Sequence, residues 1–331
     1  MSETIPEVSV IVPAYNVTEF IGAALDSVLS QTFRNFEIVV VNDGCPDTAD
    51  LERVLEPFQS RIRYIKQANK GLAGACNTAV RAARAPLILH LDPDDVLEPS
   101  CLEEQVRTMR EHPEYDAVYC NSFMFGEGSL AGRQWMDVYP SSGTVSFRAV
   151  MESLACPTNP GSIIRRDTLE RIGLYDESLR SWEDFDVWIR ILKANPPGRV
   201  GYNTGVLVQY RQRGDSLTKQ ARFMEYALAV LEKAARNFQL SPEEEEALRR
   251  RTDLVRHGVE TARGKRAIGE RRWKDAIRSF EYCHRYQPGG KTRVVLSLLR
   301  TVPWALPAGM RAWDYCLAIR QGSNGNKVAV R

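Results

Sequence analysis

The sequence predicts an α/β fold built on a mostly parallel sheet, with a helical extension at the C-terminal end. Over the first 125 residues, short apolar runs alternate with stretches of helical composition. This alternation is typical of βαβ units, in which helices connect parallel strands. After residue 126 the alternation loosens, and from about residue 220 the pattern is wholly helical. A chain of 331 residues can hold one large domain with such an extension.

Apolar, β-branched runs indicate the strands, and apolar residues three or four positions apart indicate the helices. In the first part of the chain we expect strands at residues 8–12, 36–41, 61–66, 86–91 and 115–125. Between them we expect helices at residues 17–30, 47–58, 71–84 and 99–111. Further on, we expect helices at 146–155 and 183–194 and strands at 161–165 and 200–210. We therefore predict a domain at 1–219, with halves meeting near residue 125, and an extension at 220–331.

Cysteine usage and apolar run lengths point to a cytoplasmic protein. The seven cysteines are scattered and form no C-x-x-C pair, so we expect reduced thiols rather than disulfides or a zinc site. The acidic N-terminus passes directly into a strand-like run, which is unlike a signal peptide. No apolar stretch reaches the roughly 20 residues that a membrane span needs.

Charge is unevenly distributed along the chain. Residues 261–331 carry 15 Lys/Arg and 4 Asp/Glu, whereas the first 260 residues carry 29 and 38. Such a split implies different partners for the two ends. The basic end mixes arginines with apolar residues and tryptophans, and Pro303 and Pro307 divide it into short helices. It could pack on the rest of the protein, or lie on an anionic membrane surface as a peripheral segment.

Polar residues follow several predicted strands, where an open parallel sheet binds its ligands. The first strand leads into Pro13-Ala14-Tyr15-Asn16, the second into Asn42-Asp43-Gly44, and the fourth into Asp92-Pro93-Asp94-Asp95. The first turn lacks G-x-G-x-x-G, which counts against a nicotinamide or flavin site. The absence of G-x-x-x-x-G-K-[ST] counts against a P-loop hydrolase.

The cluster of Asp92, Asp94 and Asp95 is the strongest single feature. Three carboxylates within four residues repel one another unless a cation or hydrogen-bond donors neutralise them. Mg²⁺ and Mn²⁺ favour such ligands together with substrate phosphates. The alternative is a solvated turn that caps the next helix. An EF-hand does not fit, because Leu97 stands where the loop requires Gly and a strand precedes it.

Two further acidic features also allow two interpretations. Asp43 lies in an Asn-Asp-Gly turn signal, but its expected place beside Asp92 favours a nucleotide site. Glu183 and Asp184 lie in the first turn of an amphipathic helix. They could simply complement the helix dipole, or one of them could be a general base on a rigid element.

Six motifs in order resemble the large inverting glycosyltransferase family with the GT-A fold, often called family 2. The resemblance covers roughly residues 8–218. It rests on the motifs VSVIVPAYN, VNDG, NKGLAGACN, LDPDD, SWEDFDVWIR and YRQRGDSLT. It implies a Rossmann-like nucleotide-diphospho-sugar transferase that moves a sugar to a hydroxyl acceptor in a single inverting displacement. It also implies Mg²⁺ or Mn²⁺, and makes a saccharide or lipid-linked acceptor of surface polysaccharide synthesis plausible.

The resemblance also implies roles for individual residues. Asp184 matches the catalytic base, Glu183 its neighbour near the acceptor, and Asp94, with Asp92, the metal ligands, while Asp95 supports their loop. The nucleotide-sugar contacts would be Pro13, Tyr15, Asp43, Asn69, Gly71, Asn77, Asp92 and Arg213. The last of these is a departure, because many relatives carry His at this place and Arg does not ligate metals. Arg213 suits a diphosphate instead.

Two other functions remain open from the sequence. One is a catalytically weak scaffold that binds nucleotide sugars and recruits a partner through its helical end, which the intact Asp184 argues against. The other is nucleotidyl transfer, which would normally show a glycine-rich basic loop where PAYN stands. We expect no nucleic-acid partner. The expected location is the cytoplasm, with a peripheral position at the inner face of the membrane as an alternative.

Overall fold

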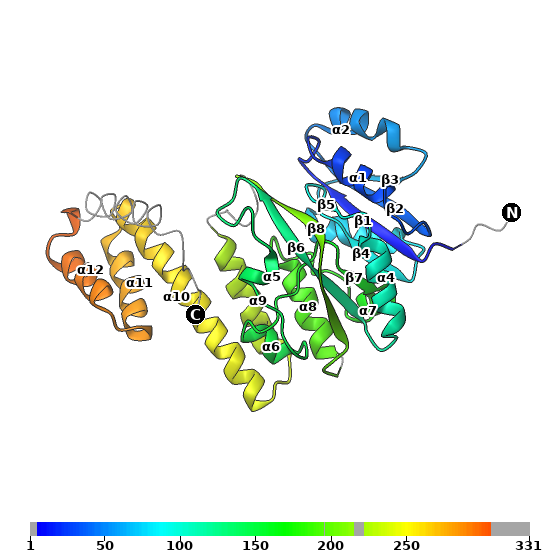
Figure 1. Cartoon of the computed structure of the whole chain (residues 1–331). Helices are drawn as coiled ribbons and strands as arrows, with labels where there is room; N and C mark the ends of the chain where they lie inside the picture. The colour runs from blue at the N-terminus through cyan, green and yellow to red at the C-terminus, as the bar shows by residue number, and fades with distance from the viewer. Residues whose placement is uncertain (1–4, 195, 215–221, 306–331) are drawn as a thin grey trace. The chain divides into compact units, whose positions relative to one another are not determined.

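The computed structural model describes residues 5–194, 196–214 and 222–305 (Figure 1). The chain divides into two compact units, one up to Arg251 and the other from Thr252. The predicted boundary at residues 219–220 precedes helix α9 (Phe223–Asn237), which packs within the first unit. The residues that follow the sheet in sequence are therefore part of the sheet unit up to residue 251.

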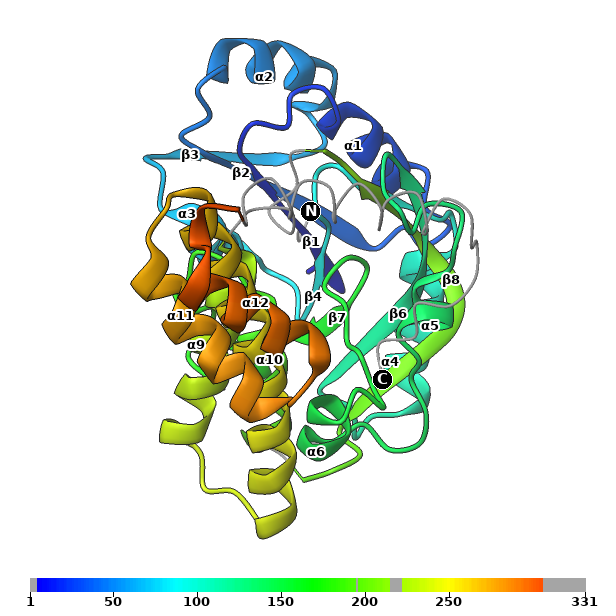
Figure 2. The same cartoon turned by 90° about the vertical axis from the view of Figure 1, so that its left-hand side faces the viewer.

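The first unit is built on an eight-stranded sheet in the order β3-β2-β1-β4-β7-β6-β8-β5 (Figures 1 and 2). The strands are β1 (Val8–Ala14), β2 (Phe36–Asp43), β3 (Arg63–Gln67), β4 (Leu87–His90), β5 (Val96–Leu97), β6 (Ala117–Gly126), β7 (Ile163–Arg165) and β8 (Val200–Gln212). All five strands expected in the first part of the chain are present. The very short β5 is the additional one.

Strand directions make the sheet mostly parallel, as predicted, but mixed. β1 pairs in parallel with β2 and β4, and β2 pairs in parallel with β3. β7 runs antiparallel between β4 and β6, and β8 is parallel to β6. The carboxyl ends of β1, β2 and β4 therefore meet at one edge of the sheet, where ligands bind in such folds.

Helices surround this sheet and cover its central strands. They are α1 (Ile21–Leu29), α2 (Thr48–Leu55), α3 (Gly71–Ala82), α4 (Cys101–Glu111), α5 (Trp135–Val138), α6 (Phe147–Met151), α7 (Arg166–Arg171), α8 (Glu183–Ala194), α9, and the first part of α10 (Pro242–Gly269), with a 3-10 turn η1 (Glu56–Phe58). Every residue of β1 is buried, because both faces of this strand are covered. Its side chains Val8, Val10 and Val12 share one core with Ile21 and Leu25 of α1.

The second unit is helical. It contains residues 252–269 of α10, α11 (Trp273–Tyr286), α12 (Gly290–Thr301) and a 3-10 turn η3 (Pro303–Ala305), with α11 packed beside α12 (Figure 2). Its small core includes Phe280, which lies so close to Gly264 that a Cβ there would come within 2.7 Å of the ring. No helix among the described residues is long and apolar enough to span a bilayer. The part of the predicted basic end from residue 306 onward, including Pro307, lies outside the described residues.

Candidate active site

The ends of β1 and β2 carry the first group of predicted site residues. Pro13 pairs with Val41 and Ala14 with Asn42, so the end of β1 lies beside the end of β2, and Tyr15 and Asp43 come next at the carboxyl edge of the sheet. Pro13 is buried, whereas the Tyr15 side chain is 48% exposed. The edge thus combines a fixed backbone with an aromatic ring open to a ligand.

The Asp43 side chain accepts hydrogen bonds from the start of the NKGLAGACN motif and from the strand before it. Its Oδ1 accepts hydrogen bonds from Gln67 Nε2 at 2.7 Å and from the Lys70 backbone N at 2.8 Å. The Asn69 Oδ1 in turn accepts from the Gly71 backbone N at 3.1 Å. Gly71 has φ +79°, a left-handed conformation that glycine adopts readily. The 69–71 segment is therefore held at the end of β2, as the predicted nucleotide pocket requires.

The acidic turn after β4 is braced from β8. The Asp95 N donates to the Asp92 carbonyl at 3.0 Å, which closes the turn. Arg211 donates from its backbone N to Asp95 Oδ1 at 2.7 Å and from Nε to the Asp94 carbonyl at 2.8 Å. The Arg211 guanidinium also lies over the rings of Phe20 and Phe125, at 5.0 and 4.4 Å. Sequence reasoning missed this role of Arg211.

Arg213 lies beside the same turn. Its Nε is 3.4 Å from Asp94 Oδ2, and its guanidinium lies 4.9 Å from the Phe20 ring centroid. Burial and the Asp92 charge together raise the pKa of Asp94 to about 6, against the opposing Arg213 charge. Arg213 thus supplies positive charge next to the predicted metal ligand.

His90 is a second residue that sequence reasoning passed over. It ends β4, is 2% exposed, and its Nε2 lies 2.9 Å from Asp92 Oδ1. On its other side, Nδ1 lies 3.8 Å from the buried Cys76 Sγ. A histidine in an apolar strand, two residues before an acidic turn, was the available signal. Through these two contacts, His90 connects the acidic turn to Cys76 of α3.

Glu183 and Asp184 begin α8 after a strained residue. Trp182 has φ +64°, which is uncommon for a large side chain. Glu183 is 5% exposed, and burial with the neighbouring Asp184 charge raises its pKa to about 8. Asp184 is partly exposed, and its Oδ1 accepts from the Phe185 N at 2.7 Å. Burial and the Asp92 charge raise the pKa of Asp184, while the His90 charge lowers it.

The predicted acidic groups therefore act on one another across distant segments of the chain. The clearest sign is Cys76, whose thiol pKa is raised by burial and then by the charges of Glu183, Asp92, Asp184 and Asp43. Because Coulomb interactions fade with distance, the ends of β2 and β4 and the start of α8 lie around this buried residue. Asp43, Asp92, Glu183 and Asp184 therefore lie close enough to Cys76 for their charges to raise its pKa.

Asn77 connects the two sides of this cluster. Its amide donates to the Tyr175 carbonyl and to Glu177 Oε1, both at 2.9 Å, and accepts from the Tyr175 N at 2.8 Å. The side chain is 2% exposed. Asn77 therefore holds the chain segment that leads into α8 against α3.

The donor set suits a hard divalent cation only in part. Asp92 and Asp94 offer oxygen ligands on one tight turn, and the pKa of Asp94 is raised by burial and by the neighbouring Asp92 charge. Within the described ranges, no group of three or more His, Cys, Asp or Glu side chains is arranged to hold a metal. Mg²⁺ is commonly held by one or two carboxylates plus substrate phosphates, so these residues fit an ion that the substrate helps to bind.

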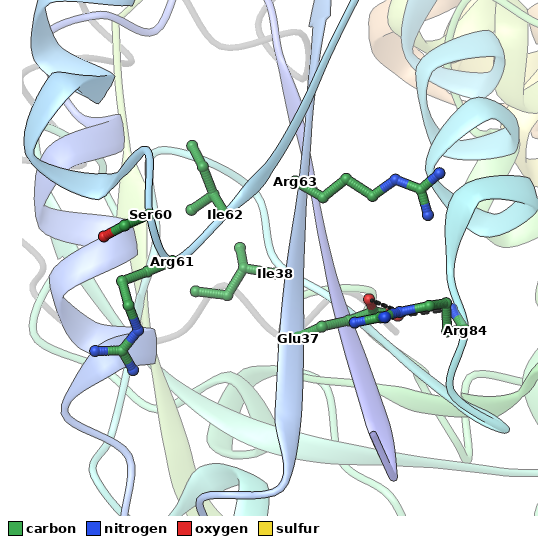
Figure 3. Close-up of a pocket in the computed structure, with 7 residues that line it drawn as sticks. All are labelled: Glu37, Ile38, Ser60, Arg61, Ile62, Arg63 and Arg84. Carbon is green, nitrogen blue, oxygen red and sulfur yellow. Dashed lines mark hydrogen bonds and ion pairs between the residues drawn. The ribbon is translucent and has the colours of Figure 1, made fainter. Parts of the chain in front are cut away.

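A pocket of about 340 Å³ lies away from this cluster, near the beginnings of β2 and β3 (Figure 3). Figure 3 shows Arg84 joined to Glu37 there, at 2.9 Å between Nε and Oε2. Its remaining lining residues are Ile38, Ser60, Arg61, Ile62 and Arg63. This pocket contains none of the predicted site residues.

Comparison with solved structures defines the class of the fold. The S. aureus protein TarS in complex with UDP superposes with a TM-score of 0.60 at 19% identity, over 92% of each chain. TarS is also solved with UDP-GlcNAc. The mannosyltransferase PcManGT from Pyrobaculum calidifontis, in complex with GDP-Man and Mn²⁺, gives a TM-score of 0.59 at 18% identity, over 98% of this chain and 89% of that one. The fold is the GT-A fold of glycosyltransferases.

Sequence comparison then gives the family. Residues 9–173, about half of the chain, match the family described as Glycosyl transferase family 2, and the chain belongs to that family. An uncharacterized glycosyltransferase of Rickettsia felis is 27% identical over 221 residues, which make up 65% of this chain and 36% of that protein. The chain thus spans about a third of the length of this relative.

Proposed function

We propose that this protein transfers a sugar from a nucleotide diphosphate donor to a hydroxyl acceptor, by a single displacement that inverts the anomeric centre. The observation that supports the proposal is that the Asp92 charge raises the pKa of Asp184, as expected if this base candidate lies near the acidic turn. In this reaction the acceptor oxygen attacks the anomeric carbon, the bond to the diphosphate breaks, and the acceptor proton passes to a carboxylate. No covalent enzyme intermediate is needed.

Asp184 is the proposed base. A hydroxyl is a weak nucleophile, and a positioned base typically contributes about 10²–10⁴-fold to the rate. Burial raises the pKa of Asp184, which brings its proton affinity closer to neutral pH and favours proton acceptance during attack. Glu183, with a pKa of about 8, would be protonated at neutral pH and could donate a hydrogen bond near the acceptor.

The donor would occupy the edge formed by β1, β2 and α3. The exposed Tyr15 ring and the backbone at Pro13 would contact the nucleotide, and Asp43 would fix the base edge. Asn69, Gly71 and Asn77 would shape the pocket, and Asp92 would face the ribose. Arg213 would pair with the diphosphate, since guanidinium suits phosphate oxygens. The ligands of the structural neighbours, UDP, UDP-GlcNAc and GDP-Man, support this donor class.

Asp94 and Asp92 would hold Mg²⁺ or Mn²⁺. The bound ion would neutralise the charge that develops on the diphosphate leaving group. Mn²⁺ in the PcManGT structure supports the use of such an ion. Arg213 next to Asp94 supplies part of the same positive charge, so we propose a weaker dependence on metal than in relatives with His at this position.

Turnover of sugar nucleotides by the purified chain tests the proposal. UDP-GlcNAc and GDP-Man, each with Mn²⁺ and with a saccharide acceptor panel, are assayed for release of UDP or GDP. We expect release with at least one donor, and a loss of about 10²–10⁴-fold in Asp184→Asn while UDP or GDP binding survives. Nucleotide binding without turnover in the unmodified chain would favour the scaffold alternative.

We also propose that the second unit places the enzyme on an anionic membrane surface in the cytoplasm, where a lipid-linked or polysaccharide acceptor would be assembled. Residues 252–305 carry 12 Lys/Arg and 5 Asp/Glu. Val294, which follows the exposed Arg293 in sequence, is 53% exposed, and Trp304 in η3 is 75% exposed. This mixture of cationic and apolar side chains suits an interfacial segment.

Cosedimentation with vesicles tests this placement. We expect binding to vesicles containing phosphatidylglycerol, none to pure phosphatidylcholine, and loss of binding in Arg293→Glu with Trp304→Ser. Arg61→Glu, on the sheet unit, is the matched control. Equal binding by both variants would contradict the assignment to the second unit.

A further inference from the structure

We propose that Lys233 in α9 is a positioning residue for the base Asp184. The inference rests on the proposed function and extends it to a helix beyond residues 9–173, the part of the chain that matches the family. α9 lies beside α8 within the sheet unit (Figure 1). Lys233 would act through α8 and would not touch the substrate.

Lys233 bridges two carboxylates. Its Nζ donates to Asp186 Oδ1 at 2.7 Å and to Asp176 Oδ2 at 2.6 Å. Asp186 is 1% exposed, and its other oxygen accepts from Arg190 Nε at 2.7 Å. A buried carboxylate is costly without its counter-charges, so Asp186 holds Lys233 firmly against α8.

Asp186 lies in the same first turn of α8 as Asp184. Its backbone N donates to the Trp182 carbonyl at 3.0 Å, which ties it to the left-handed residue before the helix. Phe223, at the start of α9, packs on the Trp182 ring with centroids 5.1 Å apart. α9 therefore contacts the start of α8 at two points. Phe223 packs on the Trp182 ring, and Lys233 forms an ion pair with Asp186.

Asp176, the second carboxylate that Lys233 contacts, connects α9 to the segment that is anchored on α3. Asp176 Oδ1 accepts from the Ser178 N and Oγ at 2.9 and 2.6 Å, so its segment is rigid. The neighbouring Tyr175 is fixed to Asn77 of α3, as described above. Lys233 thus joins the helix that carries the base to the segment anchored on α3, which begins in the predicted donor pocket.

Loss of the ammonium group should leave donor binding intact and misplace the base. A displacement of about 1 Å at a reacting group can cost about 100-fold in rate. We expect Lys233→Met to lower kcat by about 10- to 100-fold and to change the KM for the donor by less than about threefold. Lys233→Arg retains a charge that can reach both carboxylates and should recover most of kcat.

The experiment uses the full chain with whichever of UDP-GlcNAc and GDP-Man it turns over. Lys233→Met, Lys233→Arg and Arg236→Met are compared for kcat, KM and calorimetric binding of UDP or GDP. Arg236, one turn further along α9, is exposed and serves as the matched control. Assays are run well below the melting temperature of each variant.

The outcomes separate the two proposals. No turnover by the unmodified chain would remove the proposed function itself. An active chain whose Lys233→Met variant keeps full kcat, or loses kcat and nucleotide binding equally, would overturn the role of Lys233. If Lys233→Met does not fold, Asp176→Asn decides, because Asp176 is more exposed than Asp186 and its loss cuts the same bridge. Full kcat in that variant would also overturn the proposal.

Discussion

Replacing Glu183 with Gln should stabilise the sheet unit, and increasingly so as the pH rises. The folded state raises the pKa of this carboxyl from its ordinary 4.5 to about 8, because the group is buried beside Asp184. An acid with a raised folded-state pKa favours folding while it is protonated. That contribution is fully present below about pH 4.5 and is lost as the pH rises towards 8.

The magnitude follows from the pKa interval. Each unit is worth about 1.4 kcal/mol, so the interval from 4.5 to about 8 amounts to about 5 kcal/mol. Gln at this position stays neutral and avoids that loss. The difference in free energy of unfolding between Glu183→Gln and the parent chain should therefore be small at pH 4.5 and reach about 5 kcal/mol above pH 8.

Hydrogen exchange of the β1 amides measures this difference for the sheet unit alone, which matters because a chain with two compact units need not unfold in one step. Both proteins are measured from pH 4.5 to 8.5 without added nucleotide or divalent cation. Glu19→Gln, at an exposed position, controls for the exchange of residue type. A stability difference that stays constant with pH would refute the reasoning.

Three further substitutions test individual contacts through urea unfolding. Each cost given below is the expected decrease in the free energy of unfolding. Arg211→Leu should cost about 3 kcal/mol, because it removes a charged hydrogen bond to Asp94 and two ring contacts; an unchanged midpoint would contradict the bracing of the acidic turn. Gly71→Ala should cost about 1–2 kcal/mol, since φ is +79° there, and a stabilised variant would argue against that conformation. Asp116→Asn should cost about 2–3 kcal/mol, because the buried carboxylate accepts two hydrogen bonds from Arg199; a neutral result would show that the pair is too solvated to contribute.

The long, strongly patterned elements could be predicted from the sequence. α8 spans Glu183–Ala194, the expected range, because its apolar residues recur at helical spacing and its first turn is acidic. β1 begins at Val8 as expected and extends two residues beyond the predicted end. In both cases burial of one continuous apolar surface sets the structure, and that surface is visible in the local pattern.

The shortest elements could be predicted only in part: the strand expected at 161–165 is present as β7, but its direction in the sheet was not predicted. β7 has three residues, Ile163–Arg165, yet it inserts antiparallel between β4 and β6 and makes the sheet mixed. The short helices α5 and α7 were not predicted. Segments this short contain less than one repeat of any reliable pattern, and their conformation depends on contacts with distant parts of the chain.

The same distinction applies to the candidate site. Asp43 and Asp92 could be placed together because parallel strands align their ends, a consequence of topology alone. The roles of His90 and Arg211 depend on contacts with particular side chains. One example is the hydrogen bond that the Arg211 backbone N donates to Asp95 Oδ1, a residue 116 positions away in sequence. No local pattern encodes such a pair. The catalytic role of Asp184 remains a prediction.

The single amide of Asn77 has a consequence for motion. It joins α3 to the approach of α8 with three hydrogen bonds. A hinge motion that separated α3 from the approach of α8 would have to break these three hydrogen bonds. If the proposed function holds, we expect substrates to enter and products to leave through rearrangements of side chains and short loops, which are faster than hinge motions.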